Sequence, residues 1–253
     1  MERECRRIRW AVKWYRLAAE QGVTEAQYNL RLCYYKGRRK AKDQAEVVEW
    51  YRLAAELGFA EAQYNLGLCY KNGDGVPKNP VEAVKWYRLA AEQGFADAQC
   101  DLGVLCSNGD GVPKNPVEAV EWLRLAAEQG MAIAQFNLGV CYSLGNGVPK
   151  NPVEAVKWYR LAAEQGYAEA QNNLGFCYYN GEGVPKNPVE AVKWYRWAAE
   201  QGEAEAQCDL GVCYENGEGV PKNQQEAIRW YRAAAAQGHK DAAAALKRLG
   251  VKP

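Results

Sequence analysis

The chain has 253 residues, of which 48% are hydrophobic and 25% charged, and its formal net charge is +1. This balance argues against a nucleic-acid-binding protein that depends on a strongly basic surface, and no stretch approaches the ~18 apolar residues of a membrane-spanning helix. The first residues, MERECRRIRW, lack the apolar core of a signal peptide. We therefore expect a cytoplasmic protein with no membrane or nucleic-acid partner. Because the chain starts abruptly inside a helical pattern, a secreted protein stays open if an upstream segment is missing.

Length alone suggests one or two globular domains. A repeat of 36 residues overrides that estimate. Tryptophan recurs at this spacing and is followed each time by tyrosine or, once, by Leu123. The repeated tryptophans are Trp14, Trp50, Trp86, Trp122, Trp158, Trp194 and Trp230. Self-similarity at this period is typical of stacked helical arrays. We predict a single all-α domain over 1–253, an α/α superhelical solenoid of antiparallel helix pairs with a right-handed superhelix.

In chain order, the pattern predicts a lone helix, six complete helix pairs and a capping helix. The lone helix is expected at 2–21, the pairs at 23–58, 59–94, 95–130, 131–166, 167–202 and 203–238, and the capping helix at 239–250. The first pair has KGRRKAKD in place of the usual loop, and Arg31 replaces a recurring glycine. We expect this pair to be looser than the others.

The first helix of each pair is short and has one apolar face. In the second pair, residues at i, i+4, i+7 and i+8 predict the core face. They are Ala62, Leu66, Cys69 and Tyr70. Gly67 stands in mid-helix, where glycine costs roughly 1 kcal/mol relative to alanine. Since this glycine recurs in most pairs, we expect it to permit close approach of a neighbouring helix.

The loop NGDGVPKN and the start of the second helix carry strong turn and capping signals. Gly73 stands where a left-handed C-cap is expected, and one carboxylate per loop is too few for calcium, which takes about 6–8 oxygen ligands. Asn79 should cap the second helix, with Glu82 completing a capping box. The expected apolar face of this helix contains Ala83, Trp86, Tyr87, Ala90 and Ala91. Arg88 is expected to pair with Glu92 at i, i+4.

The nine cysteines do not form a disulfide framework. Five of them occupy one repeat position: Cys33, Cys69, Cys141, Cys177 and Cys213. Equivalent positions of packed helices lie about 8–10 Å apart, which exceeds the ~7 Å limit of a disulfide. We predict small buried thiols. A ladder of single thiols cannot supply the four ligands of zinc, and neither a metal nor a cofactor is expected.

The repeats share the pattern A-x-A-Q-x-N-L-G-x-x-Y-x-N-G-x-G-V-x-x-N-x-x-E-A-x-x-W-Y-x-x-A-A-x-x-G. This pattern resembles the Sel1-like repeat family, a relative of the tetratricopeptide repeat with a longer inter-helix loop. The resemblance covers nearly the whole chain and is specific for fold but weakly specific for function. It implies an adaptor, expected to be monomeric, that holds partner proteins or peptides. Cysteine-rich bacterial members pair one cysteine on each helix of a repeat. Because the second helices here lack that cysteine, those disulfides are not carried over. The sequence gives little support to the penicillin binding associated with those members.

The repeats differ from one another mainly on the first helix, at positions i, i+4 and i+7, which form one stripe. The resemblance to tetratricopeptide arrays implies that this stripe lines a concave groove. It also implies that an asparagine beside the stripe binds a peptide backbone, since an amide both donates and accepts. The predicted groove residues are Tyr28, Asn29, Leu32, Tyr35, Tyr64, Asn65, Leu68, Lys71, Cys100, Asp101, Val104, Phe136, Asn137, Val140, Asn172, Asn173, Phe176 and Tyr179. Drift on a solvated face is the alternative interpretation.

A second candidate surface is an arginine ladder on the second helices. It comprises Arg16, Arg52, Arg88, Arg124, Arg160, Arg196 and Arg232. The ladder suits an acidic partner, but pairing of each arginine with the glutamate four residues on explains it without one.

The inventory of reactive side chains argues against an enzyme. The chain has one histidine, His239, and neither of its serines, Ser107 and Ser143, begins an S-x-x-K motif. Motifs for a metalloprotease, a P-loop or a dinucleotide site are also missing from the sequence. The sequence therefore predicts a non-enzymatic scaffold that binds a protein or peptide. The alternatives are a structural or consensus-designed array with no specific ligand and, with little support, a penicillin-binding or hydrolase-like repeat protein.

Overall fold

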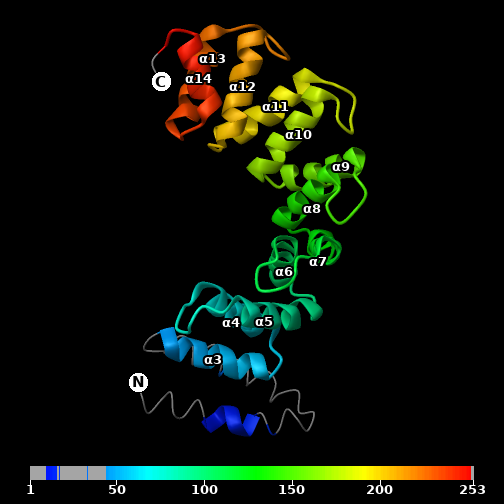
Figure 1. Ribbon diagram of the computed structural model, residues 1–253, viewed down its shortest axis with the longest axis vertical. Helices are drawn as coiled ribbons and strands as arrows, with labels where there is room; N and C mark the ends of the chain where they lie inside the picture. The colour runs from blue at the N-terminus through cyan, green and yellow to red at the C-terminus, as the bar shows by residue number, and fades with distance from the viewer. Residues whose placement is uncertain (1–9, 16, 18–32, 34–43, 252–253) are drawn as a thin grey trace. The chain divides into compact units, whose positions relative to one another are not determined.

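The computed structural model describes residues 10–15, 17, 33 and 44–251 (Figure 1). Four predicted groove residues, Tyr28, Asn29, Leu32 and Tyr35, lie outside this part of the chain. Within it, every regular element is a helix. None of the helices in the described ranges is long and apolar enough to cross a membrane.

The chain divides into two compact units, residues 1–126 and 127–253, which are described separately. The first unit contains α3 (Gln44–Glu56), α4 (Ala60–Asn72), α5 (Pro80–Glu92), α6 (Ala96–Asn108) and most of α7 (Pro116–Glu128). The second contains α8 (Ala132–Leu144), α9 (Pro152–Glu164), α10 (Ala168–Asn180), α11 (Pro188–Glu200), α12 (Ala204–Asn216), α13 (Gln224–Ala236) and α14 (Lys240–Arg248). Consecutive helices pack together within each unit, which confirms the predicted all-α class of paired helices.

The recurring glycine permits the close approach that its repetition predicted. A β-carbon on Gly67 would lie 2.7 Å from the ring of Tyr87, which is fully buried. In the second unit, a β-carbon on Gly175 would lie 2.7 Å from the ring of Tyr195. In four of the described pairs the tyrosine of the second helix therefore fills the space above the glycine of the preceding first helix, and Leu123 takes this place above Gly103.

The predicted helix ends are largely confirmed. Gly73 is left-handed, with φ of 87°, and its N–H donates to the Cys69 carbonyl. The Asn79 side chain accepts from the Glu82 N–H at 3.2 Å. The returning half of the capping box is wrong, because the Asn79 N–H donates to the Tyr70 carbonyl at 2.8 Å. The Glu82 carboxylate instead pairs with Lys85 at 2.8 Å.

Buried glutamines bridge neighbouring helix pairs, a feature that the sequence interpretation missed. Gln63 is 4% exposed, and its Nε2 donates to the Ala55 carbonyl at 3.1 Å. Its Oε1 accepts from Gln93 Nε2 at 2.7 Å. Gln171 does the same in the second unit, donating to the Ala163 carbonyl at 3.1 Å. These bonds satisfy a polar group inside the interface and fix the stacking of successive pairs.

The predicted pairing with the glutamate four residues on is wrong for Arg88, Arg160 and Arg196, which have other partners. Arg88 pairs with Glu118 on the next second helix, with 2.7 Å between guanidinium and carboxylate. Arg160 donates to the Tyr178 hydroxyl at 2.6 Å, and Arg196 to the Tyr214 hydroxyl at 2.9 Å. The ladder reaches between helices because a planar, long guanidinium finds nearer partners on the adjacent element.

The prediction of free thiols is confirmed for the cysteines in the described part of the chain. The seven buried cysteines in this part of the chain are free thiols. Burial raises the pKa of the Cys177 thiol to about 11, so this group is an inert core side chain at neutral pH.

Candidate functional site

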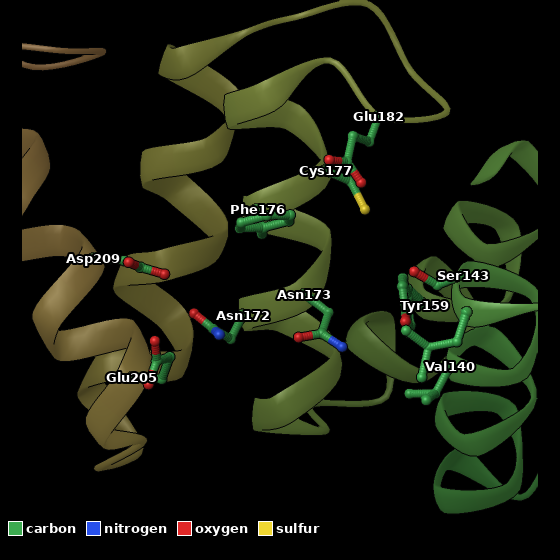
Figure 2. A pocket seen from close by; sticks show the side chains of 11 residues that line it. Val140, Ser143, Tyr159, Asn172, Asn173, Phe176, Cys177, Glu182, Glu205 and Asp209 are labelled. Atoms are coloured by element: carbon green, nitrogen blue, oxygen red, sulfur yellow. The ribbon is translucent and has the colours of Figure 1, made fainter. Parts of the chain in front are cut away.

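A pocket of about 360 Å³ opens in the second unit, where the first helices α8, α10 and α12 come together (Figure 2). It is lined by Val140, Ser143, Leu144, Tyr159, Asn172, Asn173, Phe176, Cys177, Glu182, Glu205 and Asp209. Four of these were predicted groove residues: Val140, Asn172, Asn173 and Phe176. Three consecutive first helices thus contribute to one concave site.

Apolar side chains line part of the pocket, beside the polar groups of Ser143, Asn173 and Glu182. Phe176 on α10 is 46% exposed, and Leu144 at the end of α8 is also exposed. Leu144 was missed, although it stands where four of the other repeats have asparagine, as at Asn108 and Asn180. Together with Val140, these side chains offer apolar surface to a ligand side chain.

One end of the pocket is acidic. Figure 2 shows Asp209 and Glu205 on α12, facing the side of α10 that carries Asn172. Burial, reinforced by the carboxylates of Glu205 and Glu203, raises the pKa of Asp209 to about 7, against a smaller lowering by His239. His239 Nε2 lies 2.8 Å from a Glu205 carboxylate oxygen. This end therefore combines low solvation with excess negative charge.

Asn172 is a buried amide in the wall of the pocket. It is 8% exposed, and its Oδ1 has no hydrogen-bond partner among the described residues. A buried polar atom without a partner costs about 1–3 kcal/mol. An unsatisfied acceptor at this point in a pocket is the kind of exception that functional sites carry.

The equivalent predicted residues of the first unit are placed differently. Tyr64 packs against Tyr87 and Phe95, with ring centroids 5.5 and 5.2 Å away. Asn65 Nδ2 donates to the Glu61 carbonyl of its own helix at 2.7 Å. Cys100 is buried, at 5% exposure. Leu68, Lys71, Asp101 and Val104 are partly exposed.

The remaining predicted residues of the second unit divide between packing and surface. Phe136 lies 5.3 Å from the Tyr167 ring and 6.0 Å from the Tyr159 ring. Asn137 is partly exposed. The Tyr179 hydroxyl donates to Glu218, and its ring lies 6.5 Å from that of Tyr195. At the first position of the predicted stripe, Tyr64 and Phe136 contribute to packing between helices, whereas Asn172 lines the pocket.

The family model of the Sel1 repeat matches the chain at 8–23, 24–59, 60–95, 96–131, 132–167, 168–203 and 204–239. The chain belongs to the Sel1 repeat family. Sel1 repeat proteins are generally non-catalytic scaffolds that bind protein partners. The sequence resemblance to this family is therefore confirmed.

Solved Sel1 repeat structures resemble this chain over most of its length. A protective antigen of uropathogenic Escherichia coli is 39% identical, with a TM-score of 0.77 over 91% of this chain and 50% of that one. This chain thus spans half the length of the antigen. A Sel1 repeat protein from Oxalobacter formigenes is 41% identical, with a TM-score of 0.69 over 76% of this chain and 81% of that one.

A more distant structure, of a Sel1 repeat protein from Klebsiella pneumoniae, shares the fold. It is 22% identical, with a TM-score of 0.50 over 80% of this chain and 99% of that one. A comparison with curated proteins returned no match.

Proposed function

We propose that this chain is a non-enzymatic scaffold that binds an extended segment of a partner protein in the pocket between α8, α10 and α12. The single observation that carries the proposal is the convergence of variable first-helix positions from three repeats on one cavity. Its volume of about 360 Å³ suits a few side chains rather than a folded domain. Apolar surface at Phe176 and Val140 would hold side chains, and the amide of Asn173 would bind the peptide backbone.

The reactive groups around the pocket support binding rather than catalysis. Cys177 is held as a thiol by its raised pKa of about 11. His239 has both ring nitrogens engaged, since Nδ1 accepts from the Ala242 N–H at 3.3 Å and Nε2 lies 2.8 Å from Glu205. Covalent catalysis requires an activated nucleophile, whereas burial and the nearby Glu182 carboxylate both raise the pKa of the Cys177 thiol.

The free thiols also support a location in the cytoplasm, which we include in the proposal. Buried, unpaired cysteines are usual in reducing compartments, whereas secreted proteins use cysteine for disulfides. Fractionation of cells that produce the protein tests this location directly.

Selection of phage-displayed random peptides on the purified protein tests the proposed function. Synthesised peptides from the selection are measured by fluorescence anisotropy against Phe176→Asp and a matched control, Leu161→Asp. Leu161 is 44% exposed but is not in the pocket lining. We expect Phe176→Asp to weaken binding at least about ten-fold, equivalent to about 1.4 kcal/mol, and Leu161→Asp to change it less than about two-fold.

Thermal unfolding followed by circular dichroism verifies that both variants are folded. The proposed function is wrong if no peptide is selected above background, or if selected peptides bind the Phe176→Asp variant as tightly as the wild type. Selection of none would favour an array without a specific ligand.

A further inference from the structure

Two aspartates occupy the same repeat position in the two units but have different surroundings. Asp101 on α6 and Asp209 on α12 are separated by three repeats of 36 residues. In the first unit, Lys71 Nζ lies 3.8 Å from an Asp101 carboxylate oxygen. The Tyr64 hydroxyl donates to the same carboxylate at 3.4 Å. The charge of the partly buried Asp101 is therefore balanced from within the chain.

The second unit has lost both of these partners. The residues equivalent to Tyr64 and Lys71 are Asn172 and Tyr179. Tyr179 directs its hydroxyl to Glu218 instead, and the Asn172 Oδ1 has no partner among the described residues. No lysine, arginine or histidine of the described chain pairs with Asp209 within 4.0 Å. Burial raises the pKa of Asp209, and the negative charge of the nearby Glu205 and Glu203 raises it further.

We propose that this end of the pocket binds the ammonium or guanidinium group of a lysine or arginine side chain from the partner segment. The proposal rests on the proposed function and deepens it by specifying the chemistry of the bound residue. The cation of the partner segment forms an ion pair with Asp209, as Lys71 does with Asp101. It donates to the Asp209 carboxylate and supplies a donor for the Asn172 Oδ1.

The neighbouring residues suit the rest of such a side chain. A lysine or arginine has a hydrocarbon stem that packs on apolar surface while its charged end remains solvated or paired. Phe176 and Val140 line the same pocket as Asp209, so the stem lies against apolar surface when the charge reaches the acid. A metal ion is a poorer occupant, because no group of three or more metal-binding side chains occurs within the described ranges.

Matched peptide pools test this inference. Each pool contains extended peptides with apolar residues around one fixed position, which is lysine, glutamine or glutamate. Binding is measured by fluorescence anisotropy to the wild type and to Asp209→Asn, Asp101→Asn and Tyr179→Lys. Tyr179→Lys places a lysine where Lys71 stands in the first unit and leaves the charge of Asp209 in place, and Asp101→Asn is the matched control.

We expect the wild type to bind the lysine pool at least about ten-fold more tightly than the glutamine pool, and the glutamate pool more weakly still. Asp209→Asn and Tyr179→Lys should reduce this preference to less than about two-fold, and Asp101→Asn should preserve it. Circular dichroism shows whether Asp209→Asn and Tyr179→Lys are folded. If one of them is not, the lysine preference of the other tests the inference.

The outcomes separate this inference from the proposed function. If all three pools bind the wild type equally and Phe176→Asp abolishes that binding, the groove is functional and the inference alone is overturned. A lysine preference that persists in folded Asp209→Asn also overturns it, because the cation then binds elsewhere. If none of the pools binds, both proposals fail.

Discussion

Asp101 and Asp209 stand at the same repeat position but have different surroundings in the two units. The two aspartates lie in the same helical framework. A β-carbon on Gly67 would lie 2.7 Å from the Tyr87 ring, and a β-carbon on Gly175 would lie 2.7 Å from the Tyr195 ring. Asp101 is paired with Lys71 at 3.8 Å, whereas the described chain provides no such cation for Asp209. In a repeat protein, a binding site can therefore arise by removing an internal partner, without adding a new reactive residue. Each prediction below tests one part of this comparison.

Gly67→Ala and Gly175→Ala should give the largest effects. The added methyl group overpacks a buried tyrosine ring, and its distance to the ring is 2.7 Å in both units. We expect each variant to lose about 1–3 kcal/mol of stability. Native-state hydrogen exchange of α4 and α5, and of α10 and α11, measures the two losses separately. Clearly unequal stability losses would show that the helix packing around Gly67 differs from that around Gly175. The two aspartates could then not be compared as residues in equivalent surroundings.

Asp209→Asn should stabilise the protein at alkaline pH. The folded-state pKa of about 7 is above the usual value of 3.8, so the folded state binds a proton more tightly than the unfolded state does. Wild-type stability should therefore fall as pH rises from about 4 to 7. The variant should gain more than about 1 kcal/mol at pH 8 and lose its advantage near pH 4. Urea unfolding at both pH values measures this gain. An advantage that stays constant with pH would contradict the assignment.

Tyr179→Lys should lower the pKa of Asp209 below its value of about 7. The new ammonium group supplies the favourable charge that Lys71 gives to Asp101. The stability gain should be smaller than for Asp209→Asn, about 0.5–1 kcal/mol, because the substitution also removes the hydrogen bond from Tyr179 to Glu218. Carbon NMR titration of the Asp209 carboxyl measures the pKa. An unchanged value would show that lysine at this position does not reach the acid.

Lys71→Met should have the smallest effect, in the opposite direction. Burial already raises the pKa of Asp101, and the charge of Lys71 opposes this shift. Removal of the ammonium should raise this pKa further, while stability changes by less than about 0.5 kcal/mol because the pair is partly exposed. The same NMR titration measures the result. A fall in the pKa of Asp101 would exclude Lys71 as its balancing charge.

Much of the fold was predictable from the sequence because its signals are local and repeated. Asn79 and Gly73 mark the helix ends in the sequence and occupy those roles in the structure. The exceptions depend on neighbouring elements. The pairing of Arg88 with Glu118, rather than Glu92, follows from the distance between two second helices, which a single-helix pattern does not contain.

The candidate site was predictable only in part for the same reason. Variation among repeats identified Val140 and Phe176, which line the pocket. Variation did not identify Glu205, and it gave Asp209 no special standing, because aspartate also occupies the equivalent position at Asp101. The importance of Asp209 depends on which cations are absent from its surroundings, and that is a property of three dimensions.

The glutamine bridges have a consequence for changing the length of the array. Gln207 donates to the Ala199 carbonyl and accepts from Gln237, as Gln171 does with Ala163 and Gln201 one period earlier. If a whole 36-residue module were inserted inside either unit, its buried glutamine could donate to an alanine carbonyl of the preceding module and accept from the glutamine that ends its own second helix. An insertion one residue shorter or longer would leave a buried glutamine amide without its hydrogen-bond partners. The array is therefore expected to lengthen only in complete modules.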